Sequence, residues 1–157
     1  FGQVLFPGLR FGYLLLSPAL SEAAGAVRRI RTGGASSLVQ MLVFRLIESG
    51  SLARALDAVR LQMSIRMEGL SSALSRELPE FRFSRPEGGI YLWLDTPGLD
   101  GVRAASLSLA RGVRVMPGEA FSVEGEKVEG VRLSISRHDT HTLARAASAL
   151  ATAWRAS

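Results

Sequence analysis

The sequence predicts a mixed α/β protein whose second half is an α+β layer, a sheet covered by helices. Three observations favour this fold class. A long apolar stripe at helical spacing runs through residues 51–78, apolar and polar residues alternate in short segments after it, and apolar residues make up 47% of the chain. The 157 residues suffice for one domain with a real core.

The first elements are two short apolar runs. Residues 4–6 and 11–16, VLF and FGYLLL, predict buried strands on either side of the Pro7-Gly8 turn. Apolar strands need partners at both edges and cover on both faces. We therefore expect these strands to belong to a larger α/β domain.

Three helices are predicted to follow. Residues 20–31 and 35–48 have helical patterns, which Gly33-Gly34 and Gly50 end. The pattern over residues 51–78 is the clearest, because apolar residues recur every three or four positions and form one stripe. The stripe consists of Leu52, Leu56, Val59, Met63, Met67, Leu70 and Leu74. Pro79 then ends the helix.

The second half alternates between strands and helices. Alternating apolar residues indicate strands, and amphipathic patterns indicate helices. The predicted segments are strands at 80–86 and 90–95, a weak helix at 100–111, strands at 113–118 and 131–136, and a helix from 139 or 140 to about 154. Asp139 or Thr140 caps this last helix.

Composition and charge exclude several classes of function. The net charge is 19 − 14 = +5, but the arginines are scattered, so no nucleic-acid partner is expected for this portion. There are no cysteines, and His138 and His141 have no third ligand nearby, so we expect neither a disulfide nor a metal site. No apolar run has the length of a membrane span and no signal peptide is present. We expect a cytoplasmic protein without a membrane partner.

Arg10 is the first candidate binding residue. It follows a strand and a turn, and a guanidinium group there can hold a phosphate or a carboxylate with two parallel hydrogen bonds. The alternative is an ordinary surface arginine after a turn. The residues alone do not decide between the two.

Four motifs together resemble one family. VLFPGLRFGYLL (4–15) resembles the segment after the Schiff-base lysine in fold-type I pyridoxal-phosphate aminotransferases of class I/II, above all the branch similar to aminoadipate and kynurenine aminotransferases. The aminotransferase-like domain of MocR-type regulators shares this segment. PEGGIYLWLD (86–95), GVRVMPGEAFS (112–122) and GVRLSIS (130–136) resemble later motifs of the family, in the same order. The resemblance covers essentially the whole chain.

The resemblance implies a fold, a division into parts and partners. The chain would be the C-terminal portion of the PLP-dependent transferase fold. Residues 1–50 would be the end of the large cofactor-binding domain, 51–78 a long interdomain helix, and 79–157 the small α+β domain. The intact protein would use pyridoxal 5'-phosphate to move an amino group between an amino acid and a 2-oxo acid, as a homodimer.

The resemblance also implies roles for single residues. Arg10 matches the arginine that binds the cofactor phosphate, and Arg132 matches the arginine that binds the substrate α-carboxylate. Both ligands are oxyanions that a guanidinium group fits. Without the motif, Arg132 would be a strand residue that points to water. Tyr91 and Trp93 are either pocket aromatics or core residues, and we expect Trp93 in the core.

Position 3 departs from the family pattern. The Schiff-base lysine is expected at 10 − 7 = 3, where this chain has Gln3. An amide nitrogen is neither a nucleophile nor a general base, so no residue is assigned a catalytic role and this chain is expected to be inactive. Lys127, the only lysine, lies in a distant polar loop. Gln3 is a sequence artefact, a replacement that traps bound substrate, or the mark of a non-catalytic relative.

Two further functions stay open. One is the ligand-sensing aminotransferase-like domain of a winged-helix, MocR-type transcription regulator, which would bind cofactor and ligand as a switch. The other is a decayed product without activity. In this family the residues that stack on the pyridine ring lie upstream of the lysine, so the cofactor site in this chain is expected to be incomplete.

Overall fold

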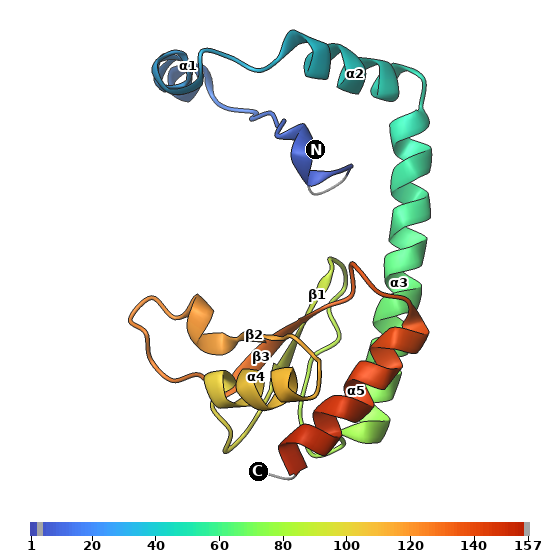
Figure 1. The fold of residues 1–157 in the computed structure, drawn as a ribbon. Coiled ribbons are helices and arrows are strands. Elements are labelled where there is room, and N and C mark those ends of the chain that lie inside the picture. The colour runs from blue at the N-terminus through green and yellow to red at the C-terminus, as the bar shows by residue number, and fades with distance from the viewer. Residues whose placement is uncertain (3–4, 156–157) are drawn as a thin grey trace. The chain divides into compact units, whose positions relative to one another are not determined.

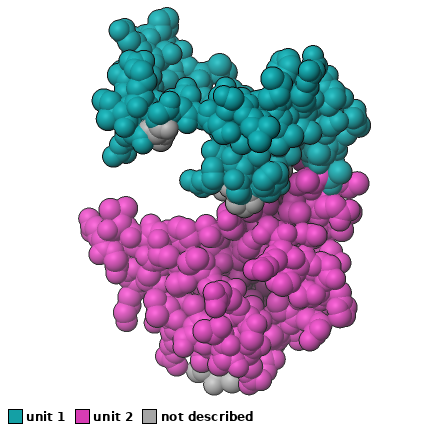
Figure 2. All heavy atoms as spheres, turned by 45° about the horizontal axis from the view of Figure 1, so that its top comes forward, with its two compact units in different colours: residues 1–58 teal, residues 59–157 magenta. Residues whose placement is uncertain are grey.

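The computed structural model describes residues 1–2 and 5–155, and the chain divides into two compact units, residues 1–58 and residues 59–157 (Figure 1, Figure 2). The longest helix, α3 (Ser51–Glu77), begins in unit 1 and continues into unit 2. Each unit has its own internal packing.

Unit 1 is helical. A short 3-10 turn, η1 (Pro7–Leu9), is followed by the helices α1 (Pro18–Thr32) and α2 (Ser37–Glu48) and by the first turns of α3. Pro18 starts α1, where its missing N–H costs no hydrogen bond. Gly33 ends α1 in the left-handed conformation, with φ of 64°. Both helices predicted for this part of the chain are confirmed.

The prediction of two opening strands is wrong for the described residues. Residues 5–6 and 11–16 form no strand, and position 4 lies outside the described residues. A strand needs a neighbouring strand to receive its backbone hydrogen bonds. The described part of unit 1 provides no such neighbour, because the strands that the structure describes all lie in unit 2.

Unit 1 buries few apolar side chains. Among its described residues, only Leu9 and Val43 have buried apolar side chains. Leu15, Ile30 and Leu38 are 88%, 87% and 79% exposed. α2 is rich in apolar residues, and several of them are exposed within this chain, as expected for a helix that is covered in a larger protein: Leu38, Met41, Leu42, Phe44 and Ile47. Helices α1 and α2 therefore have no substantial core of their own within this unit.

Unit 2 contains a three-stranded antiparallel sheet with the strand order β1-β3-β2. The central strand β3 (Gly130–Ser134) lies between β1 (Tyr91–Asp95) and the short β2 (Met116–Pro117). The register places Arg132 opposite Trp93 on one side and opposite Met116 on the other. Residues directly opposite one another share a face of the sheet, so these three side chains lie on the same face.

The other face of the sheet is the core face. Its side chains pack in one cluster with apolar residues of α4 (Gly101–Ala110), α5 (Thr140–Arg155) and the second half of α3. The strand residues in this cluster are Leu92, Leu94, Val131 and Leu133. Burial alternates along β1 because successive residues of a strand point to opposite faces. A sheet covered by helices on one face is the α+β layer that the sequence predicts.

The helix predictions also hold in unit 2. α3 ends at Glu77, and its apolar stripe is buried in the core at Met67, Leu70 and Leu74. Asp139 caps α5, because its Oδ1 accepts a hydrogen bond of 2.8 Å from the Thr142 N–H. None of the helices in the described ranges is both long enough and apolar enough to cross a bilayer.

Two strand predictions need correction. Residues 80–86 form no strand, although the Asp95 N–H donates one hydrogen bond of 2.9 Å to the Arg82 carbonyl. The strand predicted at 113–118 is reduced to Met116–Pro117. Alternating side chains are a local pattern, whereas a ladder requires a partner strand elsewhere in the chain. Residues 80–86 form one hydrogen bond with β1 but no ladder, and only Met116–Pro117 of the second segment pair with β3.

Candidate functional site

The predicted site residue Arg132 lies on the open face of the unit 2 sheet. The open face is the sheet face that bears Tyr91, Trp93, Asp95, Met116, Arg132 and Ser134, none of which is buried. Arg132 is in the middle of the central strand, so side chains from both neighbouring strands flank it. The sequence folds this way because β3 alternates between Val131 and Leu133 in the core and Arg132 on the open face.

The guanidinium group of Arg132 lies over two aromatic rings. Its central carbon lies 3.9 Å from the centre of the Tyr91 ring and 4.7 Å from the centre of the Phe121 ring. A guanidinium group is attracted to the negative face of an aromatic ring. Among residues 1–2 and 5–155, no carboxylate forms a salt bridge with Arg132. The N–H donors along the edge of the group are therefore available to an oxyanion.

Phe121 reaches this place from the 3-10 turn η2 (Gly118–Phe121), which packs directly on β3. A Cβ atom at Gly118 would lie 2.5 Å from a methyl carbon of Val128 and 2.8 Å from the Gly130 carbonyl oxygen. Only a glycine permits so close an approach. The Glu119 side chain fixes the same turn by accepting a hydrogen bond of 3.3 Å from the Val128 N–H.

Trp93 lies on the open face rather than in the core, so the expectation for this residue is wrong. Its side chain is 37% exposed, and its indole N–H donates a hydrogen bond of 2.9 Å to Asp95 Oδ1. The indole lies over Gly130, where a Cβ atom would be 2.5 Å from a ring carbon. Its ring meets that of Phe121 edge to face, with 6.1 Å between the centres.

Sequence reasoning assigned no role to Phe121. The residue ends the motif GVRVMPGEAFS, which was the available signal. What the sequence could not show is that η2 brings this ring to the guanidinium group of a residue eleven positions later, 132 − 121 = 11. Tyr91, which the sequence left between pocket and core, lies on the open face with its ring under the Arg132 guanidinium group.

The Gly88-Gly89 pair makes the turn that leads into β1. Gly89 has φ of 86°, and no atom lies within 4 Å of a Cβ built at either glycine. The two glycines therefore serve the conformation of the turn, and no other described group packs closely where their side chains would lie. A hollow of about 730 Å³ lies between this turn and α3, with Met63 and Met67 among its lining residues.

Arg10, the predicted phosphate ligand, belongs to unit 1. It follows η1 with φ of 44°, in the left-handed region that residues other than glycine rarely adopt, and its side chain is exposed. No acidic side chain in the described part of the chain forms a salt bridge with it. The structure therefore brings Arg132 together with aromatic rings, while Arg10 stands in the other unit. Gln3 lies outside the described residues.

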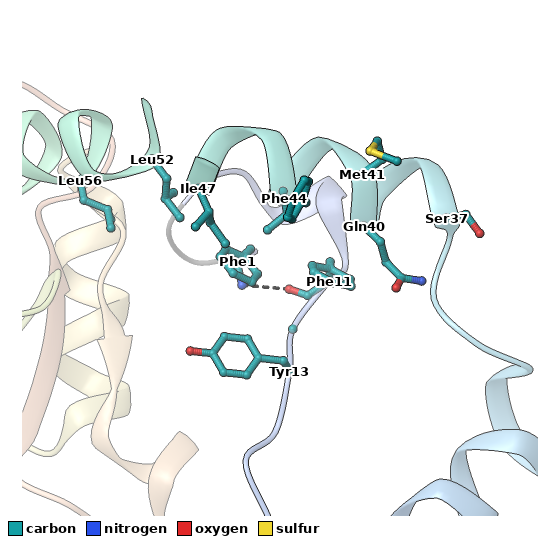
Figure 3. A pocket seen from close by; sticks show the side chains of 12 residues that line it. Phe1, Phe11, Tyr13, Ser37, Gln40, Met41, Phe44, Ile47, Leu52 and Leu56 are labelled. Carbon is teal, nitrogen blue, oxygen red and sulfur yellow. Dashed lines mark hydrogen bonds between the residues drawn. The ribbon is translucent and has the colours of Figure 1, made fainter. Parts of the chain in front are cut away.

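Unit 1 also contains an apolar hollow of about 990 Å³ (Figure 3). Figure 3 shows Phe1, Phe11 and Tyr13 facing side chains of α2 and the start of α3. The rings of Phe1 and Phe11 are stacked, with centres 5.6 Å apart. Arg10 is not among the residues that line this hollow. No group of three or more potential metal ligands exists among the residues that the structure describes.

A family model for aminotransferases of class I and II matches residues 4–150. The chain is 31% identical over 146 residues to the 2-aminoadipate transaminase of Thermus thermophilus. This match covers 92% of this chain and 36% of that protein. It is 28% identical over 134 residues to an uncharacterized HTH-type transcriptional regulator of Bacillus subtilis, with 84% of this chain and 27% of the regulator covered. The chain thus spans about a third of the length of the curated relatives it matches.

The fold is similar to that of a solved aminotransferase. The α-aminoadipate aminotransferase of Thermus thermophilus, solved with N-(5'-phosphopyridoxyl)-L-leucine, matches with a TM-score of 0.89 and 28% identity. The match covers 98% of this chain and 40% of that structure.

Proposed function

Because this chain belongs to the class I and II aminotransferases, we propose that it is part of a pyridoxal-phosphate-dependent enzyme that moves an amino group between an amino acid and a 2-oxo acid. One observation carries the proposal. Arg132 presents a guanidinium group beside two aromatic rings on an open sheet face, without an acidic partner among the described residues. Such a group suits the carboxylate that amino acids and 2-oxo acids share.

Arg132 binds and orients the substrate through that carboxylate. A guanidinium group donates two parallel hydrogen bonds to the two carboxylate oxygens, which fixes the direction of the α-carbon as well as the charge. A lysine at the same position would supply the charge without the direction. The two nearby rings shield part of the group from water and so strengthen its interaction with the anion.

Arg10 is the residue of this chain that fits the cofactor phosphate. Its guanidinium group is exposed, and its left-handed backbone turns the chain directly after η1. When bound, pyridoxal phosphate supplies an electron sink at the substrate α-carbon. Arg10 anchors the phosphate, because the N–H donors of its planar guanidinium group can bond to two phosphate oxygens at once.

The proposed division of the chain follows the family. Residues 1–50 form the end of a large cofactor-binding domain, residues 51–78 an interdomain helix, and residues 79–157 a small domain. The continuous helix α3 and the separate core of unit 2 support this division. The exposed apolar residues of α2 support burial within a larger assembly, for which we propose a cytoplasmic homodimer.

The enzyme proposal is tested with the protein expressed from its complete reading frame, both as found and with Gln3→Lys. We expect no measurable amino transfer with Gln3. We expect Gln3→Lys to raise the rate at least about a hundredfold, because an amine restores the nucleophile and the general base. A folded Gln3→Lys protein that transfers no amino group to any 2-oxo acid would contradict the proposal.

A second candidate function is the ligand-sensing domain of a transcription regulator. The match to a helix-turn-helix regulator of Bacillus subtilis supports it. In that protein type, binding of cofactor and ligand acts as the switch, so the loss of turnover that Gln3 implies matters less. The coding DNA upstream of residue 1 discriminates between the two functions. A continuous frame into a winged helix selects the regulator, and a frame into a large α/β domain selects the enzyme.

A further inference from the structure

The two aromatic rings beside Arg132 give that residue a defined orientation. We propose that Tyr91 and Phe121 are positioning residues, which hold the plane of the Arg132 guanidinium group so that its N–H edge meets the incoming carboxylate. The inference rests on the carboxylate role proposed for Arg132. It adds two residues that act on the substrate only through the arginine.

Cation–π contact suits this task because the attraction is to the ring and uses none of the N–H donors as hydrogen bonds. The Tyr91 ring centre is 3.9 Å and the Phe121 ring centre 4.7 Å from the central guanidinium carbon. The five N–H donors lie in the guanidinium plane, so the rings do not compete with an anion for them. The long side chain of an unrestrained arginine loses rotamer freedom when it binds a ligand, and this loss of entropy weakens binding. Contacts that already restrict the side chain reduce that cost.

An acidic partner would hold the arginine equally well but would block the site. A neighbouring carboxylate competes with the substrate carboxylate for the same N–H donors. The nearest acidic residue on β1, Asp95, instead accepts the Trp93 indole N–H at 2.9 Å. No described carboxylate forms a salt bridge with Arg132. Aromatic rings therefore orient this arginine in the place of an ion pair.

Both rings are placed beside Arg132 by the backbone fold of unit 2. Tyr91 lies in β1, opposite Ser134 of the central strand. Phe121 is fixed by η2 and by edge-to-face contact with Trp93 at 6.1 Å. Trp93 in turn lies over Gly130. The backbone positions of both rings, and the Trp93 contact of Phe121, therefore come from the fold of unit 2, as a positioning role requires.

The test uses nuclear magnetic resonance on the full 157-residue chain. The Nε–Hε signal of Arg132 is identified because it is lost in the variant Arg132→Lys. Sodium acetate is then added in increasing amounts and replaces sodium chloride, so that the ionic strength stays constant. In the wild-type chain we expect acetate to shift this signal until binding is saturated. We also expect the two rings to move the resonances of the Arg132 Cδ protons upfield, with or without acetate. In Tyr91→Leu and in Phe121→Leu we expect the upfield shift to shrink and the acetate affinity to fall about threefold.

Matched variants separate positioning from general damage to the fold. Tyr91→Phe keeps the ring and should restore wild-type affinity. Tyr13→Leu removes the other tyrosine of the chain, which lies in unit 1. Phe44→Leu removes another ring beside an arginine, because the centre of the Phe44 ring lies 5.9 Å from the central guanidinium carbon of Arg45. Neither control should alter the Arg132 signal.

The outcomes distinguish this inference from the proposed function. Wild-type acetate affinity in Tyr91→Leu and Phe121→Leu overturns the positioning role and leaves the carboxylate role of Arg132 intact. An Arg132 signal that shows the ring shift but never responds to acetate overturns the carboxylate role, and the inference with it.

Discussion

Gly130 determines where the Trp93 indole can lie. A Cβ atom at this position would be 2.5 Å and 2.8 Å from two carbons of the indole ring, distances that packed atoms do not tolerate. Trp93 in turn supports Phe121, which stacks on Arg132. The absence of a side chain at Gly130 therefore influences Arg132 through the contacts of Trp93 and Phe121.

We expect Gly130→Ala to displace the Trp93 indole and to weaken its hydrogen bond to Asp95. The free energy of unfolding should fall by about 1–3 kcal/mol, as for other substitutions that overpack a well-packed site. Urea unfolding followed by circular dichroism measures the loss, and the indole N–H resonance reports the displacement. Gly88→Ala is the matched control, because nothing lies within 4 Å of a Cβ there. Wild-type stability of Gly130→Ala would contradict the prediction.

At the scale of elements, the sequence predicted helices better than strands. A helix is set by contacts three and four residues apart, so the apolar stripe and terminal residues of α3 and α5 were sufficient to find them. The segments 11–16 and 80–86 have suitable strand patterns but find no partner strand. The candidate site follows the same rule. The motif predicts Arg132 as a candidate residue, whereas its contact with Phe121 depends on the folded turn η2.

The start of α5 makes the fold sensitive to acid. The Thr142 N–H bonds to Asp139 and lowers the pKa of this carboxyl group below its ordinary value. The folded chain then holds the Asp139 proton less tightly than the unfolded chain. This carboxylate therefore contributes its full stability above the unfolded pKa of about 3.9 and loses it as pH falls through the lower folded pKa.

We expect Asp139→Asn to reduce this acid sensitivity. Asparagine keeps a cap for α5 but carries no titrating carboxyl group. The difference in unfolding free energy between the wild type and Asp139→Asn should shrink as pH falls below about 4. Urea unfolding at neutral and acidic pH measures it. A constant difference across that range would show that the charge of Asp139 does not act on the helix.

At the scale of the whole molecule, apolar burial is distributed unevenly. The described core cluster lies entirely in unit 2, where α5 alone contributes Leu143, Ala147, Leu150, Ala151, Ala153 and Trp154. Unit 1 has α1 and α2 with many apolar side chains in contact with solvent. Local stability follows the density of buried apolar contacts.

We therefore expect amide hydrogens of α1 and α2 to exchange at least about a hundredfold faster than those of β3 and α5. Hydrogen exchange with mass spectrometry on the 157-residue chain measures the rates. Leu150→Ala opens a cavity in the core and should accelerate exchange in α5 while leaving α1 unchanged. Leu15→Ala is the control at an exposed site. Equal rates in both units would contradict the prediction.

The two faces of the unit 2 sheet also give the protein two distinct fluorophores. The chain has two tryptophans: Trp93 on the open face beside the Arg132 stack, and Trp154, which is only 4% exposed and donates its indole N–H to the Ala104 carbonyl. A small quencher such as acrylamide reaches the first indole and not the second. The emission of the unlabelled protein therefore separates into an accessible part that reports occupancy of the open face and a protected part that reports the integrity of the core.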